Sequence, residues 1–160
     1  MTVSSASSLF GRPVTHLHCV GVGGMGMAPL AIYLAQSGYY VSGEDDALGD
    51  ELKVPLARAG VVLSGLRETC ELVVLSSAIS AAHPTARLAM ERGIRMVKRG
   101  ELLAEVMRDR RLVAVCGSHG KTTATAMLIT ILQQSGFEAG YILGGLFADA
   151  KIPPASVGRN

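Results

Sequence analysis

Two glycine-rich turns hold the residues whose types and spacing suit chemistry on phosphates. The second turn is the more specific one, and it follows the apolar run Leu112–Cys116. It consists of Gly117, Ser118, His119, Gly120, Lys121, Thr122 and Thr123. In such a loop the backbone N–H groups bind phosphate oxygens, Lys121 reaches the β- and γ-phosphates, and the Thr122 hydroxyl can ligate Mg²⁺. The turn therefore predicts an ATP-binding site with Mg²⁺ as its metal.

One position of this turn departs from the commonest phosphate-binding pattern. The pattern G-x-x-x-x-G-K-[ST] has glycine where Val115 stands, so the match is to a shorter variant, G-[ST]-x-G-K-T-T. His119 is expected at the apex of the loop. It is interpreted either as a loop residue that tolerates an unusual backbone conformation or as a residue that touches phosphate or substrate, and both interpretations stay open.

The first turn fits the pattern G-x-G-x-x-G between a predicted strand and a predicted helix. It consists of Gly21, Val22, Gly23, Gly24, Met25 and Gly26. The glycines permit a tight turn, a close backbone approach to a diphosphate and close helix–strand packing, and the free N–H groups at the helix start favour an anion. About twenty residues later, Asp45 stands in an acidic cluster that is either a ribose-binding position or a solvated strand end. The turn predicts a Rossmann-like nucleotide site, with a purely structural turn as the alternative.

Short apolar runs alternate with helical patterns along the chain. Strands are expected at His16–Val22, Tyr39–Ser42, Val61–Leu63, Leu72–Ser76, Ile94–Val97, Leu112–Cys116 and Ala139–Leu143. Helices are expected over about 27–38, 50–59, 84–92, 101–108 and 121–134. On the last helix the apolar stripe is expected to consist of Ala124, Met127, Leu128, Ile131 and Leu132. This alternation predicts right-handed βαβ units and an α/β fold with a parallel sheet.

The pattern also predicts how the chain is organised. Residues 1–14 are expected to be a serine-rich mobile tail, and residues 15–109 a Rossmann-like domain. A boundary is expected at the charged segment 108–111, after which residues 110–160 hold a single strand–loop–helix–strand unit with the second turn. Since an independent α/β domain usually needs about 100 residues, we expect this unit to be the start of a larger ATP-binding domain and the chain to be the front of a longer protein.

The composition of the chain argues against a nucleic-acid partner and against a membrane span. Hydrophobic residues make up 49% of the chain, the formal net charge is +2 and aromatic residues are 4% without tryptophan, which argues against a nucleic-acid partner. The charge-free stretch 19–43 is interrupted by glycines and Pro29, so a membrane span is not expected, and no signal peptide is visible. Cys19, Cys70 and Cys116 are expected to be buried, reduced thiols of a cytoplasmic protein rather than metal ligands.

Taken together, the motifs resemble those of the Mur ligase family of peptidoglycan synthesis. The resemblance runs from about His16 to Gly145 and rests on HLHCVGVGGMGMAPLA, VSGED, VVLSSAIS, VKRGELLAEVMR and AVCGSHGKTTATAM. The GSHGKTT loop is typical of the family, and the GVGGMGM turn together with SSAIS is most similar to the member that adds L-alanine. The relative that reattaches recycled murein tripeptide shares the ATP loop and stays an alternative.

The resemblance implies a role for each matching position. The first domain would bind a UDP-sugar through Gly21, Gly23, Gly24, Met25, Gly26, Asp45, Ser76, Ser77 and Arg99. Gly100 follows Arg99 where the family usually has alanine, so the local backbone differs there from the family pattern. Lys121, Thr122 and Thr123 match the ATP loop, and the pair Gly144-Gly145 matches two glycines after the next strand.

The reaction that the resemblance implies joins L-alanine to the lactyl carboxylate of UDP-N-acetylmuramate. ATP phosphorylates the carboxylate, and the amine then attacks the resulting acyl phosphate. The 160-residue chain alone is expected to be inactive, and its oligomeric state stays open. Two other classes remain: an NAD(P)-dependent oxidoreductase built on the first turn, which leaves the second turn unexplained, and a non-catalytic nucleotide-sensing module.

Overall fold

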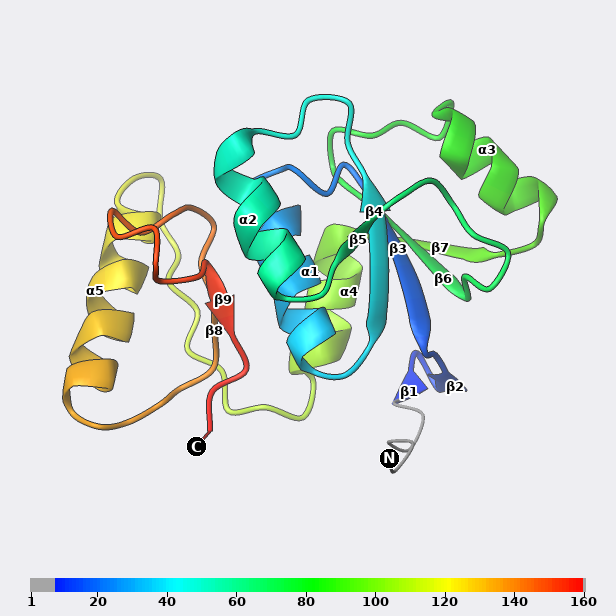
Figure 1. Ribbon diagram of the computed structural model, residues 1–160. Coiled ribbons are helices and arrows are strands. Elements are labelled where there is room, and N and C mark those ends of the chain that lie inside the picture. The colour runs from blue at the N-terminus through cyan, green and yellow to red at the C-terminus, as the bar shows by residue number, and fades with distance from the viewer. Residues whose placement is uncertain (1–7, 160) are drawn as a thin grey trace.

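The computed structural model describes residues 8–159 and contains a five-stranded parallel sheet as its main element (Figure 1). In chain order its strands are β3 (His16–Val20), β4 (Tyr40–Glu44), β5 (Val62–Leu63), β6 (Leu72–Leu75) and β7 (Arg95–Lys98). The spatial order is β5-β4-β3-β6-β7, so the order of the strands reverses beside β3. This confirms the predicted α/β fold with a Rossmann-like parallel sheet, in which ligands bind where the order reverses.

Helices cover both faces of the sheet, and the two faces have separate cores. Helices α1 (Met27–Gln36), α2 (Asp50–Arg58) and α4 (Arg99–Met107) lie on one face, and α3 (Pro84–Glu91) lies on the other (Figure 1). The larger core contains Leu17, Cys19, Leu30, Leu34, Val41, Leu52, Leu56, Val74 and Leu102. The smaller core contains Val20, Cys70, Val73, Leu75, Ala86 and Ala89. Alternation along β3 therefore sends successive side chains into different cores.

The connection from β5 to β6 contains no helix. It runs over residues 64–71 and passes the two strands that separate β5 from β6 in the sheet. Parallel crossovers are usually longer and helical. Thr69 of this connection lies 2.9 Å from His16 Nδ1, and the side chains of His16 and His18 are both buried although they are polar.

The N-terminal segment corrects one expectation. Strands β1 (Ser8–Leu9) and β2 (Arg12–Pro13) pair as an antiparallel hairpin. Leu9 is buried, and the guanidinium of Arg95 lies 4.4 Å from the centre of the Phe10 ring. The prediction of a mobile tail is therefore wrong for residues 8–14, because they form a hairpin in which Leu9 and Val14 are buried in the larger core. The rest of that tail, residues 1–7, lies outside the described residues.

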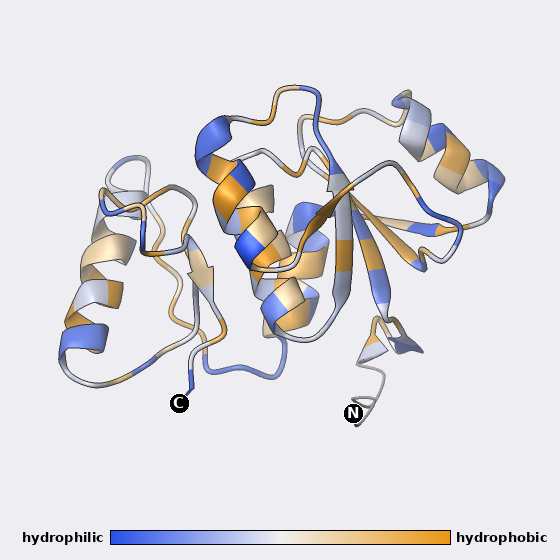
Figure 2. Cartoon of the chain, in the orientation of Figure 1, coloured by the Kyte–Doolittle hydropathy of each residue, from blue (hydrophilic) through white to orange (hydrophobic). Residues whose placement is uncertain are grey.

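After α4, a charged connection leads to a second, smaller unit, and Figure 2 shows this connection as hydrophilic. The unit contains α5 (Lys121–Gln134) and the antiparallel pair β8 (Tyr141–Ile142) and β9 (Ala155–Ser156). The pair packs on α1: Ala155 is fully buried in the larger core, and the amide of Val157 donates to Gln36 Oε1 at 3.2 Å.

The structure contradicts two expectations for this unit. Residues 112–116 are not a strand, and Leu112 and Val113 are 62% and 76% exposed. The apolar stripe expected on α5 is also largely unburied, since Met127 and Ile131 are 62% and 60% exposed and only Ile129 of this helix is buried. Strand propensity is expressed only when a neighbouring strand satisfies the backbone, and among the described residues no strand lies beside 112–116. None of the described helices has the length and apolar character to span a membrane.

Candidate functional site

The first glycine-rich turn begins where β3 ends. Gly21 adopts φ +80°, and the amides of Gly21 and Val22 both donate to the carbonyl oxygen of Glu44, at 2.9 and 3.1 Å. A Cβ atom at Gly21 would lie 2.9 Å from the Cβ of Ser76. Glycine is therefore required at this position for two reasons, the positive φ of the backbone and the lack of space for a side chain. Ser76, a predicted substrate-binding residue on another strand end, is in contact with the turn.

Free backbone amides lie at the start of α1. The amides of Met27 and Ala28 both donate to the carbonyl of Gly24 at 2.9 Å, whereas those of Met25 and Gly26 have no hydrogen-bond partner among the described residues. Gly26 lies against Arg99, because a Cβ there would be 3.2 Å from the guanidinium carbon. Two free N–H groups, a helix N-terminus and a guanidinium thus converge, which is the arrangement that binds an anion such as a diphosphate.

Asp45 closes the turn from the end of the neighbouring strand. Its Oδ2 accepts from the amide of Gly23 at 2.8 Å, and its Oδ1 accepts from the amide of Ala47 at 2.9 Å. Both carboxylate oxygens thus hold backbone in place. The structure places Asp45 beside the glycine-rich turn, and contact with a ribose stays a prediction.

The second glycine-rich turn is an open loop at the start of α5. Gly120 adopts φ +75° as the residue that precedes the helix, a conformation that suits glycine. The amides of residues 117–123 have no hydrogen-bond partner within the described part of the chain, and these residues are exposed. Figure 1 shows α1 and α5 both beginning at the upper side of the molecule. The loop thus offers a row of unpaired donors, as binding of phosphate oxygens requires.

Two side chains of this loop contact backbone oxygens. Lys121 Nζ donates to the carbonyl of Gly117 at 2.6 Å and to that of Ser118 at 3.1 Å, so its ammonium group lies over the loop. Thr122 Oγ1 donates to the carbonyl of Gly144 at 3.4 Å. A Cβ at Gly145 would lie 2.6 Å from the Thr122 methyl group, which explains why a glycine stands there. The pair Gly144-Gly145 thus lies against the second glycine-rich turn.

Two of the predicted site residues, Ser77 and His119, make no side-chain hydrogen bond among the described residues, and both are exposed.

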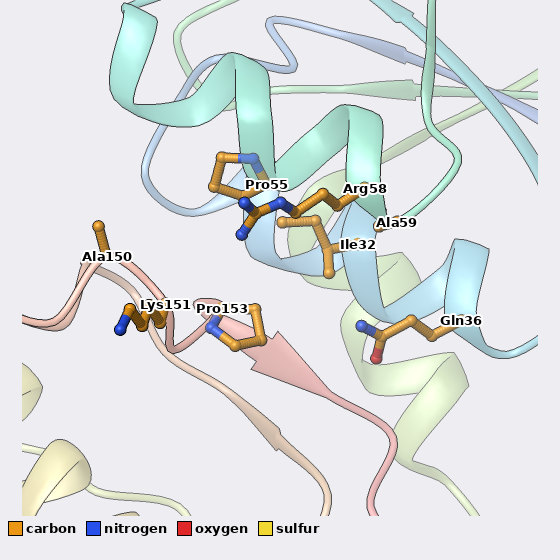
Figure 3. A pocket seen from close by; sticks show the side chains of 8 residues that line it. All are labelled: Ile32, Gln36, Pro55, Arg58, Ala59, Ala150, Lys151 and Pro153. Carbon is orange, nitrogen blue, oxygen red and sulfur yellow. The ribbon is translucent and has the colours of Figure 1, made fainter.

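Two surface hollows lie away from both glycine-rich turns. One, of about 220 Å³, lies between the C-terminal halves of α1 and α2 and the segment before β9, lined by Ile32, Arg58 and Lys151 among others (Figure 3). The other, of about 290 Å³, lies beneath the N-terminal hairpin. The free amides and Arg99 mark the candidate sites better than these hollows do.

Sequence reasoning missed Glu44 and Lys98. Glu44 ends β4 and holds the first turn through its carbonyl oxygen, while Lys98 Nζ donates to the carbonyl of Ile79 at 2.9 Å and ties down the loop after β6. In the sequence only their position points to these two residues: each is the last residue of its strand and directly precedes a residue that was predicted to belong to the site.

The cysteines behave as expected at two of three positions. Burial raises the pKa of Cys19 to about 12 and that of Cys70 to about 11, so both thiols stay protonated at neutral pH. The third, Cys116, is exposed, which corrects the expectation of burial. It lies in the segment that was predicted to be a buried strand, and without that strand nothing covers its side chain.

Comparison with known proteins places the larger unit in one family. Residues 16–111, more than half of the chain, match the family described as Mur ligase family, catalytic domain. The match covers the parallel sheet and the first glycine-rich turn and ends at the charged connection after α4.

Solved structures of related proteins resemble nearly the whole chain. A murein peptide ligase from Psychrobacter arcticus is 28% identical, with a TM-score of 0.79 over 91% of this chain and 34% of its own. The UDP-N-acetylmuramate:L-alanyl-gamma-D-glutamyl-meso-diaminopimelate ligase from Neisseria meningitides is 24% identical, with a TM-score of 0.76 over 85% of this chain and 44% of its own. The UDP-N-acetylmuramate-alanine ligase from Thermotoga maritima is 24% identical, with a TM-score of 0.81 over 89% of this chain and 35% of its own. This chain thus spans less than half the length of each structure.

Proposed function

This chain belongs to the Mur ligase family, and from that premise we propose that it serves an ATP-dependent amide ligase of peptidoglycan precursor synthesis in the cytoplasm. The reaction joins L-alanine to the lactyl carboxylate of UDP-N-acetylmuramate through an acyl phosphate. The observation that supports this most strongly is the presence of two separate sets of unpaired backbone amides, at the start of α1 and at the start of α5. One set suits a diphosphate and the other suits a triphosphate.

The UDP-sugar is assigned to the unit formed by residues 15–109. Its diphosphate would accept from the free amides of Met25 and Gly26 and from the guanidinium of Arg99. Ser76 and Ser77 at the end of β6 and Asp45 at the end of β4 would line the nucleotide. The glycines Gly21, Gly23, Gly24 and Gly26 keep the backbone close enough for this contact.

ATP is assigned to the unit formed by residues 110–160. The amides of Gly117, Ser118, His119, Gly120, Lys121, Thr122 and Thr123 would surround its phosphates. The residues present suit Mg²⁺ in part. The Thr122 hydroxyl is exposed, and its hydrogen bond to the Gly144 carbonyl is long, so it could ligate the metal. No group of three acidic, His or Cys side chains that could hold a metal ion occurs among the described residues. Mg²⁺ prefers to keep water and phosphate oxygens as its other ligands. When bound, it supplies neutralisation of phosphate charge.

The residues of this chain would act by orientation and charge. A carboxylate oxygen is a poor leaving group, so it must be phosphorylated before an amine can displace it. Lys121 would move from the carbonyls of Gly117 and Ser118 to the transferring phosphoryl group and stabilise its negative charge. The first turn would hold the sugar nucleotide so that the lactyl carboxylate lies near that group. No nucleophilic side chain is needed.

A second candidate differs only in the amine. The murein peptide ligase from Psychrobacter arcticus is more similar in sequence than the alanine ligase from Thermotoga maritima, at 28% against 24% identity. This favours a peptide amine in place of L-alanine as the alternative acceptor. An NAD(P)-dependent oxidoreductase would use the first turn alone and give the second no role.

Thermal unfolding in the presence of ligands tests the proposal. UDP-N-acetylmuramate is expected to raise the Tm of the chain, because a ligand that binds only the folded state stabilises it, while NADH leaves the Tm unchanged. Tight NADH binding without any response to the UDP-sugar would reverse this assignment. We further propose that the 160-residue chain does not ligate on its own, and alanine-dependent phosphate release by the chain alone would refute that.

A further inference from the structure

Glu44 is bonded to the first glycine-rich turn and to α3 at the same time. Its carbonyl oxygen accepts from the amides of Gly21 and Val22, the first two amides after β3. Its side chain points to the face of the sheet that α3 covers, where the hydroxyl of Thr85 donates to Oε1. Thr85 is buried in the first turn of α3. The backbone that shapes the turn is therefore tied through one side chain to an element on the other side of the strand-order reversal.

A buried row of polar side chains approaches the same carboxylate. His16 Nδ1 lies 2.9 Å from Thr69 Oγ1, and His16 Nε2 lies 2.8 Å from Ser42 Oγ. His18 Nδ1 lies 2.9 Å from the same Ser42 oxygen. The Nε2 atom of the fully buried His18 has no hydrogen-bond partner among the described residues, and Glu44 Oε2 lies 3.9 Å away from it.

The proton positions in this row follow from Glu44. A carboxylate at this distance favours a proton on His18 Nε2, since a bare ring nitrogen would repel it. His18 Nδ1 then accepts from the Ser42 hydroxyl, whose oxygen accepts from His16 Nε2. Burial lowers the pKa of both histidines, which keeps both rings neutral as this arrangement requires. The proton on His18 Nε2 then faces Glu44 Oε2 across 3.9 Å, while the hydroxyl of Thr85 donates to the other carboxylate oxygen.

We propose that Glu44 is a positioning residue for sugar-nucleotide binding, which acts by fixing the glycine-rich turn through its carbonyl oxygen while Thr85 and the buried histidine row fix its side chain. The inference rests on the proposed function, because it assigns the diphosphate to that turn. Its consequence is that Thr85, which lies on α3 rather than in the turn, sets the affinity for the nucleotide. The amides of Met25 and Gly26 keep their direction only while Gly21 and Val22 stay bonded to Glu44.

The test is a titration of the chain with UDP by calorimetry, with urea unfolding of each variant alongside. Thr85→Val keeps the shape but removes the donor, and we expect it to weaken UDP binding roughly fivefold, the equivalent of one ordinary hydrogen bond. Thr85→Ser restores the donor and should restore the affinity. Glu44→Gln, which loses the charge that faces His18, should also weaken UDP binding.

The possible outcomes separate this inference from the proposed function. Reduced affinity in Thr85→Val with rescue in Thr85→Ser supports positioning, since a purely structural contact would change the urea midpoint and leave the UDP affinity as it was. Wild-type UDP affinity in both Thr85→Val and Glu44→Gln overturns the inference alone. A wild-type chain that does not bind UDP overturns the proposed function, and this inference with it. If Thr85→Val does not fold, Glu44→Gln decides by the same criterion.

Discussion

Asp45 Oδ2 accepts a hydrogen bond of 2.8 Å from the amide of Gly23, so the carboxylate at the end of β4 is bonded to the glycine-rich turn that follows β3. In the sequence this carboxylate resembled a ribose-binding position. In the structure its second oxygen is also used, by the amide of Ala47. The residue therefore shapes the site in addition to any contact with the ligand.

This relationship predicts the effect of Asp45→Ala. Losing two hydrogen bonds that hold the turn should weaken UDP binding by about tenfold, which corresponds to roughly 1.4 kcal/mol. The binding of inorganic pyrophosphate should be weakened as well, because pyrophosphate would contact the same turn. Calorimetry with both ligands measures this, and a loss confined to UDP would instead show that Asp45 acts only on the ribose.

Gly26→Ala should weaken diphosphate binding without unfolding the chain. The backbone at Gly26 is in the ordinary helical region, but a new Cβ would lie 3.2 Å from the Arg99 guanidinium carbon and push that group away. We expect UDP affinity to fall several-fold while the Tm changes little. Gly100→Ala is the matched control, because nothing lies within 4 Å of a Cβ there; an equal loss in both variants would contradict the role given to Arg99.

Gly145→Ala should weaken the ATP binding that we propose for the second glycine-rich turn, although Gly145 lies outside that turn. The added methyl group would lie 2.6 Å from the Thr122 methyl group and must displace that side chain. ATP affinity, measured by calorimetry in the presence of Mg²⁺, is expected to fall. The neighbouring variant Gly144→Ala has open space around its Cβ and should bind ATP normally. If Gly145→Ala also binds ATP as the wild type does, the contact with Thr122 has no part in nucleotide binding.

Glu71 should make the stability of the chain sensitive to acid. Its Oε2 accepts from the amide of Thr15 at 2.5 Å, and this bond, with those from the Thr15 hydroxyl and the His16 amide, lowers the pKa of the carboxyl group below its ordinary value of 4.5. A lowered pKa in the folded state gives a stabilisation that is present above the ordinary value and is lost as the pH falls through the lowered one. Urea midpoints of the wild type should exceed those of Glu71→Gln near neutral pH and approach them on acidification. A difference between the two midpoints that does not change with pH would contradict this assignment.

The sequence predicted the parallel sheet because its strands and helices carry strong local signals. The continuous apolar run of β6 and the stripe of α1 both lead to full burial in the structure. The strand expected at 112–116 shows the limit of such signals, since residues such as Val113 report a preference for extended backbone and not the presence of a neighbouring strand.

The contacts within the site were less accessible to sequence reasoning. The meeting of His18 with Ser42 depends on the register between β3 and β4, and the contact of Gly145 with Thr122 depends on how the chain returns after α5. Neither is encoded in a local pattern. The motifs therefore identified the two turns, Asp45 and the glycine pair Gly144-Gly145, while the contacts that hold the turns in shape became visible only in three dimensions.

A titration of wild type and Lys121→Ala with UDP-N-acetylmuramate and with ATP–Mg²⁺ tests most directly whether two independent anion sites exist in this chain. The wild type is expected to bind both ligands. Lys121→Ala is expected to lose at least about tenfold in ATP affinity, as the removal of a charged donor to phosphate implies, and to bind the UDP-sugar as the wild type does. A parallel loss of both affinities in Lys121→Ala, or a wild type that binds neither ligand, would contradict the account.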